Sequence, residues 1–94
     1  MDDTATARRW KIDLHAHTWH SRDCPVSPER LVIAAKRRGL DGIAITNHDR
    51  FAGHDEAQRA AGSDFVVIPG EEVFSSAGEI IGLFLTHEIP GVDR

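Results

Sequence analysis

The sequence predicts a small α/β domain in which helices alternate with buried, mostly parallel strands. Its 94 residues suit a single domain. Short apolar runs follow two helix-like segments, so the expected order is strand, helix, strand, helix, strand, strand. Strands joined through helices pair in parallel by right-handed crossovers. We therefore expect functional side chains to gather at the C-terminal ends of the strands.

Composition excludes several classes of protein. The net charge is −4, which argues against a dedicated nucleic-acid binder, and the sequence contains no apolar run of membrane-spanning length. Cys24 is the single cysteine, which rules out an intrachain disulfide and fits a cytoplasmic location. Residues 1–9 lack the apolar core of a secretory signal, so we expect a flexible leader before one domain over residues 10–94. The sequence gives no indication of the oligomeric state.

The first strand is expected over Trp10–Leu14, followed by a loop over Thr18–Ser27. A helix over Pro28–Arg38 is indicated because serine is a good N-cap and proline suits the first helical position. Basic residues near its end favour the helix dipole, and Gly39 is suited to terminate it.

The remaining elements are expected as a strand over Gly42–Thr46, a helix over Asp55–Ala61 and a strand over Phe65–Ile68. Pro69 and Gly70 are expected to break this third strand, with extended chain resuming over Glu71–Phe74. A final strand over Glu79–Leu85 is expected to form a hairpin with that segment. A barrel needs more strands than these to close, so the chain is expected to be the N-terminal part of a larger domain.

Metal-ligating side chains stand at three predicted strand ends. His15 and His17 are two apart and should project to the same face. His48 follows the second strand, and Glu71 and Glu72 follow the third. Imidazole and carboxylate ligands without thiolate suit Zn, Mn or Fe rather than a structural zinc cluster. Several such groups together are typical of a multi-metal hydrolytic site.

Nearby polar residues have more than one possible role. Asp23 in the first loop either adds a carboxylate ligand or forms a local turn bond. Glu71 should face away from Glu72, either behind the ligands or in solvent. His20 either contacts a substrate phosphate or is an exposed loop histidine, and the second reading is preferred.

At these positions the chain resembles the PHP (polymerase and histidinol phosphatase) family of metal-dependent phosphoesterases. The residues that resemble its motifs are Asp13–Thr18 with Ser21–Asp23, then Ala44–His48, then Pro69–Val73 leading to Gly82-Leu83. The resemblance implies a distorted, TIM-like (β/α)7 barrel, incomplete in this chain. It also implies two or three divalent metal ions and hydrolysis of phosphate esters through a metal-activated water.

Ligand roles follow from the same resemblance. It implies that His15 and His17 bind one metal, that Glu72 bridges two, and that Asp23 and His48 serve a further one. Three departures stand out. Asn47 replaces the usual Asp of the second motif, and we expect it to tune the centre. Glu79 occupies the place of a metal-binding His, where it is either a ligand or a solvated strand residue. The later motifs of the family lie beyond the chain.

The main hypothesis is a metal-dependent phosphoesterase acting on a small phosphorylated substrate, with His20 or Arg22 contacting the phosphate. An alternative is a truncated PHP domain that binds metal or a partner without catalysis. An amidohydrolase-like enzyme acting on C–N bonds is less favoured. The sequence does not identify the substrate or the metal, and it leaves open whether 94 residues are active alone.

Overall fold

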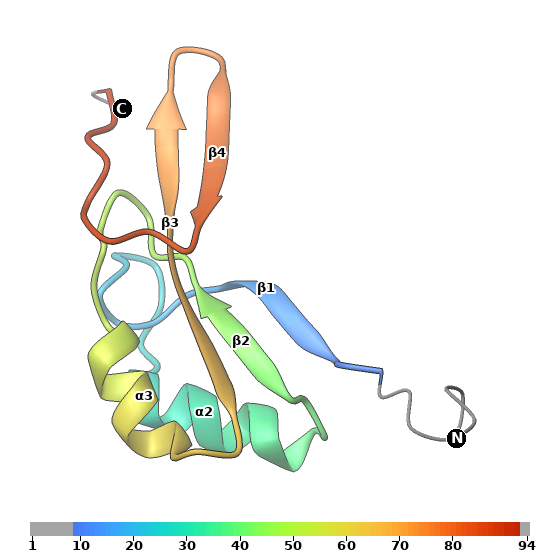
Figure 1. Cartoon of the computed structure of the whole chain (residues 1–94). Coiled ribbons are helices and arrows are strands. Elements are labelled where there is room, and N and C mark those ends of the chain that lie inside the picture. The colour runs from blue at the N-terminus through green and yellow to red at the C-terminus, as the bar shows by residue number, and fades with distance from the viewer. Residues whose placement is uncertain (1–8, 93–94) are drawn as a thin grey trace, which may run out of the picture.

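The structure, a computed structural model, describes residues 9–92 and arranges them as one mixed sheet with two helices (Figure 1). The elements are β1 (Ile12–Ala16), α2 (Pro28–Arg37), β2 (Gly42–Ile45), α3 (His54–Ala61), β3 (Val66–Ser75) and β4 (Gly78–Leu83). The sheet order is β1-β2-β3-β4, with parallel pairing from β1 to β3 and an antiparallel β3–β4 hairpin. The predicted α/β class is confirmed. The expected leader lies almost entirely outside the described residues.

Both helices pack beside β2 and the first half of β3, where they form the core (Figure 1). The buried apolar residues of this core are Val32, Ala35, Ile43, Ile45, Ala57, Ala61 and Phe65. Helix α2 begins as predicted, because the Ser27 hydroxyl accepts a hydrogen bond from the Arg30 backbone N–H at 3.2 Å. Neither of the described helices has the length and apolar character needed to span a membrane.

Strand β3 does not break at Pro69–Gly70, so that prediction is wrong. Its first half pairs in parallel with β2 up to Pro69, and its second half pairs with β4 from Gly70 onward. Pro69 therefore lies where the strand changes partners, and its carbonyl accepts a hydrogen bond from the Leu85 N–H at 3.1 Å. A proline that lacks an N–H is tolerated at such a position.

Gly70 permits this exchange because two neighbouring strands approach it closely. A Cβ at this position would lie 2.7 Å from the Gly82 carbonyl oxygen and 3.2 Å from that of Ile45. Beyond the exchange, β3 and β4 project from the sheet as a hairpin (Figure 1). The C-terminal half of β3 thus reaches past the end of β2, where the candidate site lies.

Strand β1 starts and ends two residues later than predicted, at Ile12 and Ala16, because its ladder with β2 begins at Ile12. His15 therefore lies inside the strand. The register shifts between Asp13 and Ala16, which is a local bulge. Bulges redirect side chains at the rim of a sheet, and this one immediately precedes His17.

Candidate metal centre

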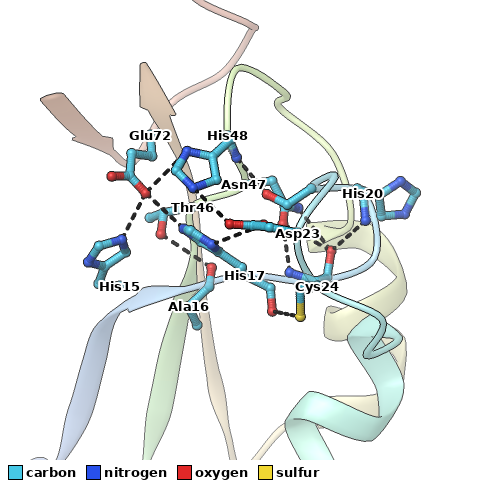
Figure 2. Close-up of polar contacts among 12 residues, drawn as sticks. His15, Ala16, His17, His20, Asp23, Cys24, Thr46, Asn47, His48 and Glu72 are labelled. Atoms are coloured by element: carbon cyan, nitrogen blue, oxygen red, sulfur yellow. Dashed lines mark hydrogen bonds and ion pairs between the residues drawn. The ribbon is translucent and has the colours of Figure 1, made fainter. Parts of the chain in front are cut away.

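Three imidazoles surround one carboxylate oxygen, Oε1 of Glu72 (Figure 2). His15 Nε2 and His17 Nε2 each lie 2.8 Å from that oxygen, and His48 Nδ1 lies 3.6 Å away. The His15 and His17 rings are 5.1 Å apart, and the His17 and His48 rings 4.4 Å. The predicted convergence is therefore present, with His15 in β1, His48 in the segment that follows β2 and Glu72 within β3.

Two further carboxylates complete the cluster. Asp23 Oδ2 lies 3.2 Å from His48 Nε2, and Asp23 Oδ1 lies 3.7 Å from His17 Nδ1. Glu79 Oε2, from β4, lies 3.2 Å from His48 Nδ1. The structure thus brings together all six side chains that the sequence suggested as metal ligands.

These side chains form three overlapping groups of suitable metal ligands. Within each group the ligand atoms lie within 4.8 Å of one another. The groups are His15, His17 and Glu72; His17, Asp23 and His48; and His48, Glu72 and Glu79. The donors are imidazole nitrogens and carboxylate oxygens, which fits divalent Zn, Mn or Fe. Adjacent groups share members, so the arrangement can hold neighbouring metal ions.

Glu72 is ionised within this cluster. Burial by itself raises its pKa, but hydrogen bonds with Glu79, His15 and His17 and the charge of His48 outweigh burial and lower the pKa to about 2. A carboxylate must be deprotonated to bind a metal. Glu72 therefore meets that requirement across the neutral pH range.

Asn47 stabilises the segments around the candidate centre through hydrogen bonds. It is fully buried, and its Oδ1 accepts a hydrogen bond from the Thr18 backbone N–H at 2.6 Å. Its Nδ2 donates to the Ala52 carbonyl at 2.9 Å, which a carboxylate could not do. The amide in place of the family's Asp thus joins the end of β2 to the loops on either side. This role explains the departure more directly than tuning of the metals.

Two further contacts fix His48. Its backbone N–H donates to the Ser21 hydroxyl at 2.7 Å. The next residue, Asp49, adopts a left-handed φ of 54°, and its N–H donates to the Glu72 carbonyl at 2.9 Å. Asp49 Oδ1 in turn accepts from the Phe74 N–H at 2.8 Å. The end of β2 is therefore joined to β3, which holds His48 beside Glu72.

Glu71 faces away from Glu72 as predicted. The alternative that the Glu71 side chain is exposed to solvent is wrong. It is fully buried, and its Oε1 accepts a hydrogen bond from the Ile89 N–H at 2.8 Å. Its Oε2 is buried without a hydrogen-bond partner among the described residues. Burial raises the pKa of Glu71; the Ile89 N–H opposes this, and the charges of Glu88 and Asp49 add to the rise. The segment that covers Glu71 lies about 18 residues later, so alternation alone could not predict its burial.

A cleft of 710 Å³ opens beside Asp23 and His48. Its lining residues are His20, Arg22, Asp23, His48, Asp49, Arg50, Gly91 and Val92. Arg22 and Arg50 bring guanidinium groups to its wall, and both side chains are exposed. Sequence reasoning identified Arg22 but missed Arg50, which stands in a loop without a motif of its own. The cleft wall therefore carries two arginines and two aspartates, Asp23 and Asp49, beside the candidate ligand cluster.

Comparison with known proteins agrees with this geometry. The family model described as the PHP domain matches residues 13–78. The chain is 35% identical over 91 residues to the uncharacterized protein MJ1587 of Methanocaldococcus jannaschii, covering 85% of the chain and 53% of that protein. It is 45% identical over 51 residues to a 5'-3' exoribonuclease of Haemophilus influenzae, covering 54% of the chain and 18% of that enzyme.

A third similarity is to the DNA polymerase III PolC-type of Oceanobacillus iheyensis. It amounts to 41% identity over 61 residues, covering 64% of the chain and 4% of that protein. The chain spans about half the length of MJ1587 and much smaller shares of the other two proteins. The family model spans His15, His17, Asp23, His48 and Glu72 and ends one residue before Glu79.

Proposed function

Since this chain belongs to the PHP domain family, we propose that it forms the metal-binding part of a phosphoesterase that hydrolyses phosphate esters. The observation that carries the proposal is the convergence of six nitrogen and oxygen ligands in three overlapping groups around Glu72. Its mixed, four-stranded sheet with two helices is consistent with part of a PHP barrel. Two or three divalent ions, Zn, Mn or Fe, would occupy these groups.

We assign different roles to the candidate ligands, which would hold the metal ions, and to the arginines of the cleft, which would hold the substrate. Bound divalent ions supply positive charge that polarises phosphoryl oxygens and lowers the pKa of water. Glu72 belongs to two ligand groups and would hold two ions together. Arg22 and Arg50 lie on the cleft wall, where they would orient the phosphate through charge-assisted hydrogen bonds. A phosphate beside Asp23 and His48 would then lie next to the metals.

The relatives support phosphoester chemistry but do not identify the substrate. The Haemophilus influenzae relative is a 5'-3' exoribonuclease, and such an enzyme cleaves phosphodiester bonds. The net charge of −4 favours a small phosphorylated compound over a long nucleic acid. We propose a small phosphate monoester or diester as the substrate class.

Metal content and phosphate release test the proposal together. The purified protein, reconstituted with Zn, Mn or Fe, should hold two or three ions by elemental analysis and release phosphate from members of an ester panel. Glu72→Ala should lose at least one ion and slow hydrolysis by roughly 100-fold or more. His87→Ala is the matched control, because His87 is exposed and belongs to none of the ligand groups.

The outcomes separate the alternatives. Tight metal binding without hydrolysis of any ester would favour a non-catalytic metal-binding domain. Failure to bind any of the three metals would contradict both readings. Hydrolysis of amide substrates in place of phosphate esters would favour the amidohydrolase-like alternative.

A further inference from the structure

We propose that His20, oriented by Glu56, is the general acid that protonates the leaving-group oxygen of the ester. This proposal rests on the proposed phosphoesterase function and assigns a role to a residue outside the metal-ligand groups. His20 lies in the loop between β1 and α2, and Glu56 lies in the first turn of α3. The two residues are 36 positions apart, so the fold brings them together.

The His20 ring is held in a defined orientation. Its Nε2 lies 2.8 Å from Glu56 Oε1, and the two side chains are 26% and 29% exposed. The His20 backbone N–H donates a hydrogen bond to the Thr18 hydroxyl at 3.2 Å. The Thr18 backbone N–H in turn donates to Asn47 Oδ1. The ring also packs closely against Gly53, where a Cβ would lie 3.1 Å from His20 Cδ2. His20 is thus not the exposed loop histidine that the sequence favoured.

The second ring nitrogen has no hydrogen-bond partner among the described residues. Within residues 9–92, His20 Nδ1 makes no hydrogen bond or ion pair, while the side chain lines the cleft with Asp23 and His48. Figure 2 shows His20 beyond Asp23 and Asn47, at the opposite end of the drawn residues from His15. A phosphate bound in this cleft would share its wall with His20, Asp23 and His48.

Glu56 also decides which nitrogen exchanges the proton. A carboxylate can only accept, so Nε2 keeps its proton for Glu56 and Nδ1 gains or releases one. The other charged groups of the cleft near this loop are Arg22, Asp23 and Arg50. A histidine with one nitrogen held by a carboxylate and the other unpaired, on the wall of a cleft, has the groups that acid–base catalysis needs.

The proton transfer completes a balanced hydrolysis. Water adds to phosphorus, the bond from phosphorus to the ester oxygen breaks, and the electron pair stays on that oxygen. The proton of His20 Nδ1 transfers to it, so the organic group leaves as a neutral alcohol. The attacking water releases one proton to solvent and neutral His20 regains one. The sum is ester plus water giving alcohol plus phosphate.

Leaving-group dependence separates this role from a structural one. We compare phenyl phosphate, whose leaving oxygen needs a proton, with p-nitrophenyl phosphate, whose leaving anion is stable without one. His20→Gln should lower kcat/KM for phenyl phosphate by about 100-fold or more but that for p-nitrophenyl phosphate by less than about 10-fold. Metal content should not change. Glu56→Gln should show the same split in milder form.

His54→Gln is the control, because His54 lies at the start of α3 and does not line the cleft. A second readout needs no activity. In ¹H–¹⁵N NMR spectra the neutral His20 ring should carry its proton on Nε2, and Glu56→Gln should weaken that preference. The proposal is overturned if His20→Gln slows both esters equally or neither, or if the proton is on Nδ1. Inactivity of the unmutated protein towards both esters would instead count against the phosphoesterase itself.

Discussion

At the scale of residues, the clearest contrast is between Glu71 and Glu72. They are neighbours on β3, yet burial raises the pKa of one while the imidazole cluster lowers that of the other to about 2. Glu72 faces three histidines and Glu71 faces the backbone of the segment at Ile89. Adjacent residues on a strand point to opposite faces, so these two identical carboxyl groups lie in different environments.

This contrast predicts the behaviour of Glu71→Gln. Because the folded-state pKa of Glu71 is raised, its contribution to stability is full below the unfolded value of 4.5 and is lost as pH rises through the folded value. Glutamine keeps an acceptor for the Ile89 N–H without the charge. Glu71→Gln should therefore be more stable than the parent at pH 7, and the difference should shrink near pH 4. Urea unfolding at both pH values measures this.

A Glu71→Gln variant that is less stable than the parent at pH 7, or whose advantage over the parent grows towards pH 4, would contradict the raised pKa of Glu71. Glu29→Gln, at an exposed position in α2, serves as the control for a generic loss of charge.

The candidate ligand residues were predictable because parallel pairing brings the C-terminal parts of neighbouring strands to one edge of the sheet, although His15 and Glu72 lie within their strands rather than after them. His15, His17, His48 and Glu72 all come together as the sequence indicated. The His20–Glu56 pair was not predictable, since it depends on how one loop folds over another element. The role of Asn47 likewise depends on Ala52, a loop residue whose position no local pattern specifies.

At the scale of elements, strand β3 is where the expectation from local sequence fails, because its pairing with two other strands decides its structure. Proline lacks an N–H and commonly ends a strand, which is why a break was predicted at Pro69. The strand instead exchanges one neighbour for another there, and extended backbone continues. The helices and the other strands follow their sequence signals to within about two residues, because caps and apolar runs specify them locally.

The exchange predicts unequal effects of adding one methyl group at two glycines. At Gly70 a Cβ would lie 2.7 Å from a backbone oxygen, which cannot move without distorting β4. At Gly82 the nearest atoms belong to the Leu85 side chain, at 3.3 Å, and can adjust. Gly70→Ala should cost about 2 kcal/mol or more of unfolding free energy, and Gly82→Ala about 1 kcal/mol or less. Equal costs in denaturant titrations would argue against a crowded exchange point.

At the scale of the whole molecule, the ligand cluster draws on side chains that are far apart in the sequence and that the sheet brings together. Its side chains come from β1, the loop that follows it, the end of β2, β3 and the projecting β4 (Figure 2). The described core lies at the other end, between the helices and the sheet (Figure 1). Bound metal would therefore brace a region that the core does not reach.

Metal should raise thermal stability accordingly. A ligand that binds only the folded state at 100 times its Kd adds about 2.7 kcal/mol, which for a domain of this size raises Tm by roughly 10 °C or more. Calorimetry with saturating Mn or Zn, compared with a chelator, measures the shift. His17→Ala should abolish most of it, because His17 belongs to two ligand groups. An unchanged Tm in saturating metal would show that the cluster does not bind these ions.

The single Glu72 oxygen that faces three histidines also constrains how this protein can evolve. A substitution at Glu72 leaves His15, His17 and His48 without their common partner, and no one compensating change can restore all three contacts. These four positions should therefore be inherited as a block, and lost together in lineages that no longer use the cluster. The His20–Glu56 pair makes no hydrogen bond or ion pair with these four side chains within the described residues, so the proposed acid role rather than contact with Glu72 would tie it to them.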